Sequence, residues 1–237
     1  MIKGPLLCID TSIPLGSVAI VDRTGQLAGL TRPDPAGQAE KLFPTIRDLL
    51  DQAGLSFAAL GGVAVASGPG SFTGLRIAAS TAKTLAWAAG KPLFAVGSLL
   101  ALAFGARQLG LPVCAGFDAG REELYAACYR WPEDSAAEEE LLAPCAVAAD
   151  ELAGRLERIA AGGRIVCLGQ GCRKYAGQFE RALGRLLEPA APDLDSPDAQ
   201  RLGRLVFDSP RRFRVGDVTA FEPDYIRVGQ AALRLKK

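Results

Sequence analysis

The chain has 237 residues, of which 49% are hydrophobic and 22% are charged. A chain of this length and composition can bury a substantial core, in one large domain or in two lobes. The formal net charge is only +1, which excludes the broad basic surface of a protein that grips nucleic acid alone through many phosphate contacts. We therefore expect that any RNA is held together with a partner.

Histidine is absent from the chain. Its absence excludes Ser-His-Asp and Cys-His catalytic groups, HExxH zinc sites and any imidazole-ligated metal in this chain. The six cysteines form no CxxC pair, and most lie in apolar segments where a reduced thiol packs as a small hydrophobic side chain: Cys8, Cys114, Cys128, Cys145, Cys167 and Cys172. We expect structural thiols and no metal site.

The first ten residues contain an apolar run of only four residues before Asp10. Such a run is too short for the core of a signal peptide, and no segment approaches the roughly 20 apolar residues of a membrane span. The sequence thus predicts a cytoplasmic protein.

The first part of the chain predicts three antiparallel strands followed by alternating helices and strands. Short apolar runs between turn residues are typical of strands, and apolar residues three and four apart are typical of amphipathic helices. The predicted strands are 5–10, 16–22, 26–31, 62–67 and 93–97, and the predicted helices are 38–54 and about 73–90.

A second region begins near Ser98, with no internal repeat visible in its sequence. It predicts helices near 98–109, 149–161, 172–185 and 197–207, and strands near 112–118, 123–130, 141–147 and 164–168. The acidic stretch 133–140 is typical of a solvated hairpin loop, and 189–198 of a surface connection. We expect a first lobe over 1–103 and a second over 104–237.

Asp10, Thr11 and Ser12 follow the first predicted strand. A carboxylate that leaves a buried strand at a hydroxyl-rich hairpin turn is where several phosphate-handling folds place a ligand for hydrated Mg²⁺. The alternative is that Asp10 and Ser12 hydrogen-bond their own turn. Local chemistry favours the turn.

A glycine-rich turn between a strand and a helix contains Gly68, Gly70, Ser71, Thr73 and Gly74. The free amides and dipole of a helix N-terminus can cradle an anion. No lysine follows the glycine and the spacing is not GxGxxG, so neither standard nucleotide motif is present. A tight structural turn with Ser71 or Thr73 as N-cap is an equal alternative.

The helix that follows this turn is apolar or small around nearly its whole circumference, with Arg76 and Lys83 as its only charges. Such a helix is normally buried on more than one side, and small side chains let another helix approach closely. One side can pack on its own sheet. The other needs a cover, which is either a partner protein or the second lobe.

Two further charged segments, 117–125 and 222–227, are ordinary in local chemistry. Tyr225 is expected to pack on the body of the protein, and Arg227 to pair with a carboxylate.

Several segments together resemble the TsaB family, also called YeaZ. The resemblance is dense over 5–103 and thinner afterwards, and its segments are IDTS, EKLFPTIRDLLDQAGL, VAVASGPGSFTGLRIAASTAKTLAWAAGKPLFAVGSL and PDYIR. GPGSFTGLR before a small-residue helix is specific to this family and to its catalytic paralogue TsaD. TsaD-like subunits bind a metal through a pair of histidines on a helix, and the absence of histidine therefore places the resemblance with TsaB.

The resemblance implies an α/β protein with the actin/Hsp70-like ATPase (ribonuclease H-like) fold, in two lobes with the second shortened. It implies a non-catalytic subunit that binds a TsaD-like catalytic subunit and a TsaE-like ATPase. The complex attaches a threonylcarbamoyl group to the adenosine beside the anticodon, so tRNA is reached indirectly. The resemblance implies no required cofactor, and it is compatible with a homodimer when the chain is alone and with a weak or interface-shared nucleotide.

The resemblance also implies residue roles. The partner interface would lie on the helices at about 38–54 and 73–90, with Leu42, Phe43, Ile46, Leu75, Arg76, Ala79, Ala82, Lys83 and Ala86. A vestigial nucleotide or anion site would comprise Asp10, Thr11, Ser12, Gly68, Gly70, Ser71, Thr73 and Gly74. The chain departs from the family at 37–40, where a His-Ser-Glu run is common, and at Arg121, one place later than usual.

Two rival functions remain. The first is a self-sufficient small ATPase or kinase that uses Asp10 for magnesium and the 68–74 loop for phosphate, although the second lobe shows no clear second phosphate loop. The other is a peptidase, which without histidine would need a Ser-Lys or carboxylate site that no spacing suggests.

Overall fold

The computed structural model describes residues 2–32, 38–132, 135 and 137–226. The chain divides into two compact units, unit 1 with residues 1–101 and 197–224, and unit 2 with residues 102–196 and 225–237. The chain therefore passes from unit 1 to unit 2 near the expected boundary at residue 103, and residues 197–224 then belong to unit 1 again. No helix in the described part of the chain is long and apolar enough to cross a membrane.

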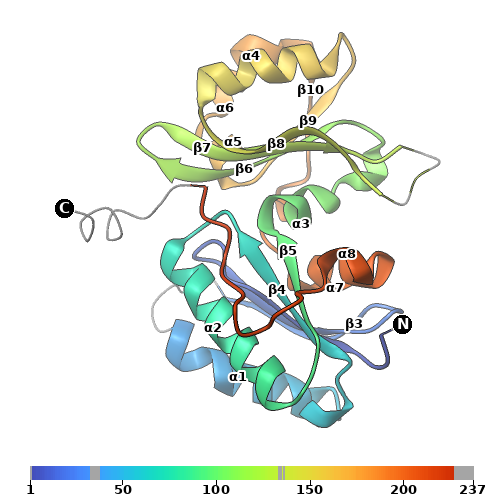
Figure 1. The fold of residues 1–237 in the computed structure, drawn as a ribbon. Coiled ribbons are helices and arrows are strands. Elements are labelled where there is room, and N and C mark those ends of the chain that lie inside the picture. Colours follow the sequence, from blue (N-terminus) through green and yellow to red (C-terminus); the bar gives the residue numbers. More distant parts are fainter. Residues whose placement is uncertain (1, 33–37, 133–134, 136, 227–237) are drawn as a thin grey trace. The chain divides into compact units, whose positions relative to one another are not determined.

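Unit 1 is built on a five-stranded sheet in the order β3-β2-β1-β4-β5 (Figure 1). Its strands are β1 (Leu6–Asp10), β2 (Gly16–Val21), β3 (Gln26–Arg32), β4 (Gly62–Gly68) and β5 (Leu93–Gly97). The first three pair antiparallel, which confirms the predicted hairpins, and β4 and β5 continue the sheet in parallel with β1.

Helices cover both faces of this sheet. Every residue of β1 is buried, and because successive strand side chains point to opposite faces, such a strand must be covered on both. Leu7 and Ile9 pack in one core with α1 (Gln38–Gln52) and α2 (Phe72–Ala88). Cys8 faces the other side, where Gly203 of α7 (Ala199–Asp208) approaches it closely. Unit 1 also contains the short helix α8 (Pro210–Phe213), and the division between the two units falls within α3 (Ser98–Phe104).

Unit 2 contains a second five-stranded sheet in the order β10-β9-β6-β7-β8. Its strands are β6 (Val113–Gly120), β7 (Glu123–Arg130), β8 (Glu139–Ala148), β9 (Ile165–Leu168) and β10 (Leu187–Glu188). The helices α4 (Ala149–Ala160), α5 (Gln170–Lys174) and α6 (Ala176–Leu183) contribute to one core with the sheet. Four 3₁₀ turns complete the described elements: η1 (Phe57–Ala59), η2 (Arg107–Leu109), η3 (Gly184–Leu186) and η4 (Pro192–Asp195).

The two sheets share one topology. In each, the first three strands in chain order pair antiparallel, and two later strands extend the sheet in parallel from the first. This duplicated arrangement is the actin/Hsp70-like ATPase (ribonuclease H-like) fold, as predicted. The repeat is structural, since the sequence shows none.

Three elements differ from expectation. The helix predicted at 172–185 is broken at Tyr175, whose φ of −108° and ψ of 22° turn the chain between α5 and α6. The break lets both Cys172 and Phe179 reach the core of unit 2. The helix expected at 98–109 ends at Phe104, before Gly105, and the two-residue strand β10 was not predicted.

Candidate functional site

Asp10 ends β1 in a buried hairpin turn and is only 1% exposed. Its Oδ1 accepts hydrogen bonds from the backbone N–H of Ser12 at 2.9 Å and from the Ser12 hydroxyl at 2.6 Å. Burial raises the pKa of Asp10 above its usual value, and it outweighs the hydrogen bonds from Ser12, which lower that pKa. The carboxyl group therefore holds its own turn, the simpler of the two alternatives that the sequence left open.

The glycine-rich loop packs directly on this turn. The backbone N–H of Ser71 donates to the Ser12 carbonyl at 2.6 Å, and the Thr11 hydroxyl donates to the Gly74 carbonyl at 2.6 Å. A β-carbon on Gly74 would overlap the Thr11 carbonyl oxygen. The glycine is thus required for close approach of two backbones, whatever ligand the loop meets.

Several amides of the loop already have acceptors within the protein. Ser71 is the N-cap of α2, and its hydroxyl accepts from the N–H of Gly74 at 3.2 Å. The N–H of Gly68 donates to the Ser98 hydroxyl at 3.1 Å. Thr73, the other candidate cap, lies exposed in the first turn of the helix. These contacts favour a structural turn, and the vestigial nucleotide site stays a prediction.

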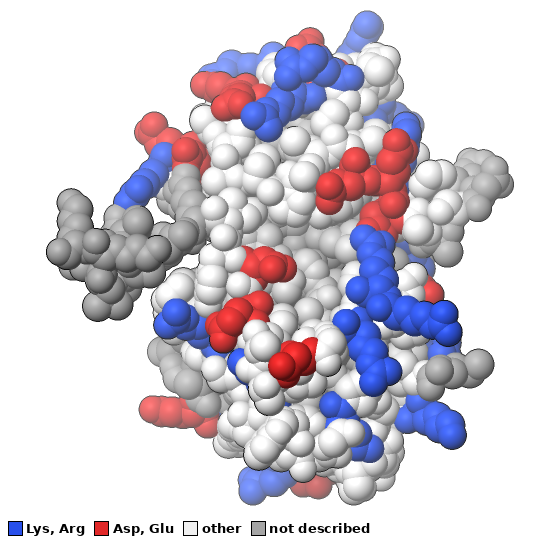
Figure 2. Space-filling model, in the orientation of Figure 1, with Lys and Arg blue, Asp and Glu red and all other residues white. Residues whose placement is uncertain are grey.

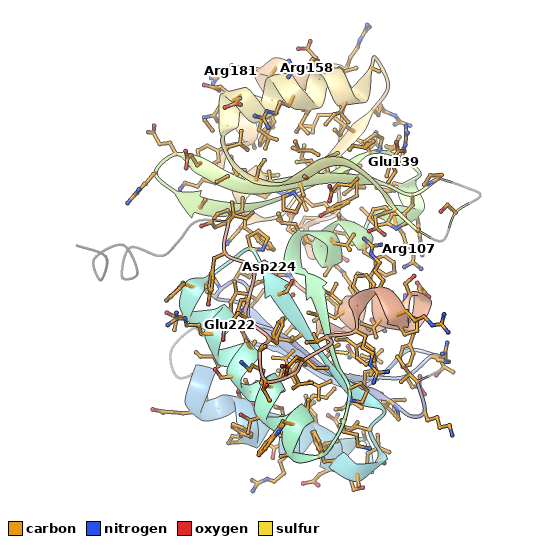
Figure 3. All side chains as sticks on the ribbon, viewed as in Figure 1. Arg107, Glu139, Arg158, Arg181, Glu222 and Asp224 are labelled. Carbon is orange, nitrogen blue, oxygen red and sulfur yellow. The ribbon has the colours of Figure 1, made fainter. Side chains whose placement is uncertain are left out.

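The C-terminal segment, residues 221–226, makes contacts that sequence reasoning missed; Figure 3 labels its Glu222 and Asp224. Asp224 donates its N–H to the Ser67 carbonyl at 2.7 Å, and its Oδ2 accepts from the Ser67 hydroxyl at 2.9 Å. Lys83 of α2 donates to the Phe221 carbonyl at 2.8 Å and lies 3.5 Å from a Glu222 carboxylate oxygen. The one sequence signal was the PDYIR match, because partners 157 positions apart leave no local pattern. Arg227 lies outside the described residues.

This segment also answers part of the question of what covers α2. Phe221 is buried in the same core as Ala78, Ala82 and Ala86 of the helix. The second buried side of α2, expected from its apolar composition, is therefore covered in part by the C-terminal segment of unit 1 itself.

The predicted interface residues separate into buried and exposed groups. Phe43 is 50% exposed and Arg76 is exposed, while Lys83 is half-buried. The other six are at most 5% exposed inside unit 1: Leu42, Ile46, Leu75, Ala79, Ala82 and Ala86. The interface stays a prediction. Of the predicted residues, only Phe43, Arg76 and Lys83 are exposed enough for a partner to contact.

An exposed row on α2, which we call the α2 stripe, consists of Thr73, Arg76, Ser80, Thr84 and Trp87. Its members are three or four residues apart and so share one helix face. Trp87 is 70% exposed. Figure 2 shows a largely uncharged surface around the C-terminal segment, with acidic side chains within it. Which side chains of α2 are exposed could not be predicted from the sequence, because the helix is apolar or small nearly all round.

The charged turn between β6 and β7 is a tight hairpin, as expected. Arg121 and Glu122 have positive φ angles of 56° and 63°. Asp118 accepts from the N–H of Gly120 at 3.0 Å and pairs with Lys174 at 2.8 Å. These contacts orient the turn within unit 2.

Comparison with known proteins gives consistent matches. Residues 35–228 match the sequence model of a family described as "TsaD: tRNA N6-adenosine threonylcarbamoyltransferase". The tRNA threonylcarbamoyladenosine biosynthesis protein TsaB of Bacillus subtilis is 32% identical over 53% of this chain and 55% of that protein. TsaB of Escherichia coli is 34% identical over 54% and 56%. The chain spans about half the length of the curated relatives it matches.

Solved structures match over more of the chain. A Pseudomonas aeruginosa protein described as similar to peptidase YEAZ aligns with a TM-score of 0.77 at 28% identity, covering 94% of this chain and all of that one. YeaZ from Pseudomonas aeruginosa aligns with a TM-score of 0.71 at 29% identity, over 94% and 99%.

Proposed function

Because the chain belongs to the family that the TsaD sequence model describes, and within it to the TsaB (YeaZ) branch, we propose that it acts in tRNA threonylcarbamoyladenosine biosynthesis as a non-catalytic subunit. In this role it binds and stabilises a TsaD-like catalytic subunit and helps to dock a TsaE-like ATPase. tRNA is reached through the complex. The net charge of +1 supports this indirect contact.

The observation that carries the docking role is the exposure of aromatic side chains on α1 and α2. Four large hydrophobic side chains are exposed in the described part of the chain, and two of them are Phe43 on α1 and Trp87 on α2. Tryptophan is enriched among the residues that dominate interface energies, because it buries a large area at small entropic cost. Their solvent exposure supports a surface that a partner covers.

The rest of the α2 stripe fits a helix-to-helix contact. Ser80 and Thr84 are small, and the Thr84 hydroxyl is bonded back to the Ser80 carbonyl at 2.8 Å, so it does not have to be desolvated as a free donor. Arg76 stacks over the Phe72 ring at 4.2 Å. A cation at the edge of an apolar contact steers association and partner choice more than it adds affinity.

The absence of catalysis is supported by chemistry. The chain offers no histidine as base or metal ligand, and one of the two carboxylate oxygens of Asp10 already accepts two hydrogen bonds from Ser12. The rival is a self-sufficient ATPase of the same fold. Steady ATP hydrolysis by the purified chain in magnesium, lost in Asp10→Asn, would favour that rival.

The docking role is tested by co-purification with the TsaD-like protein of the same organism. Trp87→Ala is expected to weaken the complex by about 2 kcal/mol, or roughly 30-fold in Kd, because truncation removes a large exposed anchor. The matched control is Leu27→Ala, which truncates an apolar side chain 43% exposed on β3 of the same unit. It should bind like the wild type.

If Trp87→Ala bound the TsaD-like protein as tightly as the wild type does, the proposal that α2 lies in the interface would be wrong. Substitutions at Ala79 or Ala82 are poorer probes, because these side chains are 4% and 0% exposed and larger residues there would disrupt the core.

A further inference from the structure

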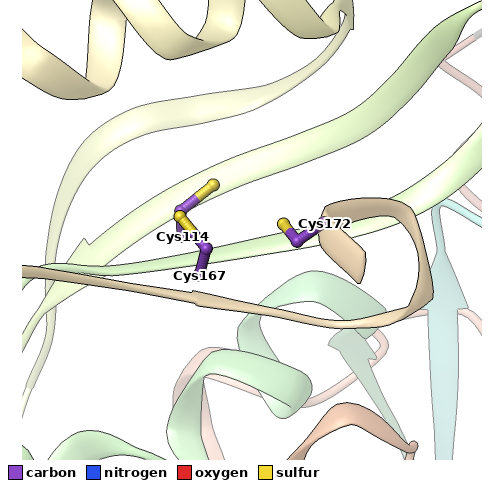
Figure 4. Close-up of side chains that lie close together, drawn as sticks. All are labelled: Cys114, Cys167 and Cys172. Carbon is purple, nitrogen blue, oxygen red and sulfur yellow. The ribbon is translucent and has the colours of Figure 1, made fainter. Parts of the chain in front are cut away.

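Three buried cysteines from separate parts of unit 2 come together in its core (Figure 4). The Sγ atoms of Cys114, Cys167 and Cys172 all lie within 4.8 Å of one another. Cys114 and Cys167 lie 53 positions apart and Cys167 and Cys172 lie 5 apart, so no CxxC spacing in the sequence indicates the group. We call them the thiol cluster.

The fold builds this cluster from three elements. Cys114 on β6 and Cys167 on β9 are paired in register on adjacent parallel strands. Cys172 lies on α5, and its sulfur sits over β6 at Gly116, where a β-carbon would come within 2.7 Å of the Sγ atom. Glycine at 116 therefore makes room for the third sulfur beside the first two.

A neighbouring buried cysteine lies outside the cluster and serves as a comparison. Cys128 on β7 is in register with Cys114 on its other side but is not part of the cluster. Burial raises the pKa of Cys128 to about 12, as expected for a thiol that packs as a hydrophobic side chain.

We propose that Cys114, Cys167 and Cys172 form a three-sulfur site for a soft metal ion, and that Cu(I) is the ion it fits best. Metal–sulfur bonds of about 2.3 Å in a flat trigonal site place the sulfurs about 4 Å apart. The cluster therefore needs a contraction of less than about 1 Å to close around an ion. For these three residues the proposal departs from the expectation of purely structural thiols.

The number of ligands selects the ion. Within the described residues, the group that can hold a metal consists of three cysteines and no fourth histidine, aspartate or glutamate. Structural Zn²⁺ prefers four ligands in a tetrahedron. Soft thiolates with a low coordination number suit Cu(I) instead.

A small cavity provides access. It has a volume of about 60 Å³ and is lined by Cys167 and Cys172 together with Arg173, Phe179, Leu187 and Ala190 among others. Arg173 is half-exposed and is held by Asp195 at 2.5 Å and by the Ala190 carbonyl at 3.1 Å. The cavity thus connects two of the three cysteines with residues at the surface, as a metal site that is loaded after folding requires.

The test is a competition for Cu(I) with the reduced full-length chain under anaerobic conditions. Cu(I) is supplied as its coloured bathocuproine complex, and loss of colour measures transfer to the protein. The wild type is expected to withdraw one Cu(I) per chain, with X-ray absorption showing three sulfur neighbours. Cys172→Ala and Cys114→Ala should each bind at least 100-fold more weakly.

The matched control is Cys128→Ala, which removes an equally buried thiol one strand away and should retain one Cu(I). No transfer to the wild type would overturn the proposal, as would equal loss in Cys128→Ala. Tighter binding of Zn²⁺ than of Cu(I) would overturn the choice of ion. A disulfide within the cluster of the anaerobically purified chain would also exclude a resident metal. If the variants fail to fold, the wild-type stoichiometry and sulfur count decide.

Discussion

Asp10 holds its carboxyl group in a buried turn, where the backbone N–H and the hydroxyl of Ser12 both donate hydrogen bonds to it. Burial disfavours the charged form and raises the pKa. Arg201 of α7 and Asp198, the N-cap of that helix, act more weakly and in opposite directions, since Arg201 lowers this pKa and Asp198 raises it. The protein therefore carries a carboxylate whose ionisation opposes folding.

Asp10→Asn is expected to gain stability relative to the wild type as pH rises. In the unfolded chain the pKa is near 3.8, and in the folded chain it is higher. Between these two pH values the folded state binds more protons, so wild-type stability falls as pH rises through the interval. Asparagine does not ionise and lacks this loss. Urea unfolding from about pH 4 to about pH 8 measures the difference between the two proteins.

Asp22→Asn serves as the comparison with the opposite sign. Hydrogen bonds from Thr24 lower the pKa of this exposed carboxylate, so its contribution is present above pH 3.8 and is lost as pH falls through the lower, folded value. Asp22→Asn should therefore lose stability at neutral pH. A difference between Asp10→Asn and wild type that stays constant with pH would contradict a raised pKa at Asp10.

At the scale of residues, short-range chemistry was predictable and long-range pairing was not. The turn of Asp10 and Ser12 follows from two positions two residues apart. The pair of Ser67 and Asp224 spans 157 positions, and the thiol cluster needs the register of two strands and the placement of a short helix. No spacing rule along one sequence encodes such meetings.

At the scale of elements, the contact between the first hairpin and α2 depends on glycine. Gly74→Ala is expected to lower the free energy of unfolding by about 2–4 kcal/mol, because its β-carbon would overlap the Thr11 carbonyl and force the two backbones apart. Gly154→Ala on α4 is the control, since nothing lies within 4 Å of its β-carbon. There alanine should stabilise by about 0.5–1 kcal/mol. Thermal unfolding of both variants measures the contrast, and a neutral Gly74→Ala would contradict the close approach.

Most elements of the fold were predictable because hydrophobic periodicity and turn residues agree along the chain. The exceptions have physical causes. In a helix as apolar as α2 the sequence does not indicate which face is exposed. It therefore could not predict that Trp87 is 70% exposed and Ala82 is 0% exposed. The break at Tyr175 and the two-residue strand β10 are set by packing on the sheet.

At the scale of the whole molecule, the two sheets repeat one strand order without repeating a sequence. The fold constrains which faces are apolar and how strands connect, and many side chains satisfy that requirement. The path of the chain is harder to predict. Helix α7 follows the continuous stretch of unit 2, yet it packs on β1 and β2 and belongs to unit 1.

Leu202→Ala and Leu152→Ala test this division, since both remove a fully buried leucine from a helix. Each should cost about 2–5 kcal/mol through lost burial and a cavity. A destabilised unit opens locally before the rest of the protein. Brief native proteolysis of Leu202→Ala should therefore cut first within 1–101, which is far from α7 in sequence but packs against it. Leu152→Ala on α4 should be cut first within 102–196. If Leu202→Ala were instead cut first within 102–196, α7 would belong with the second lobe. That result would support the single boundary near residue 103.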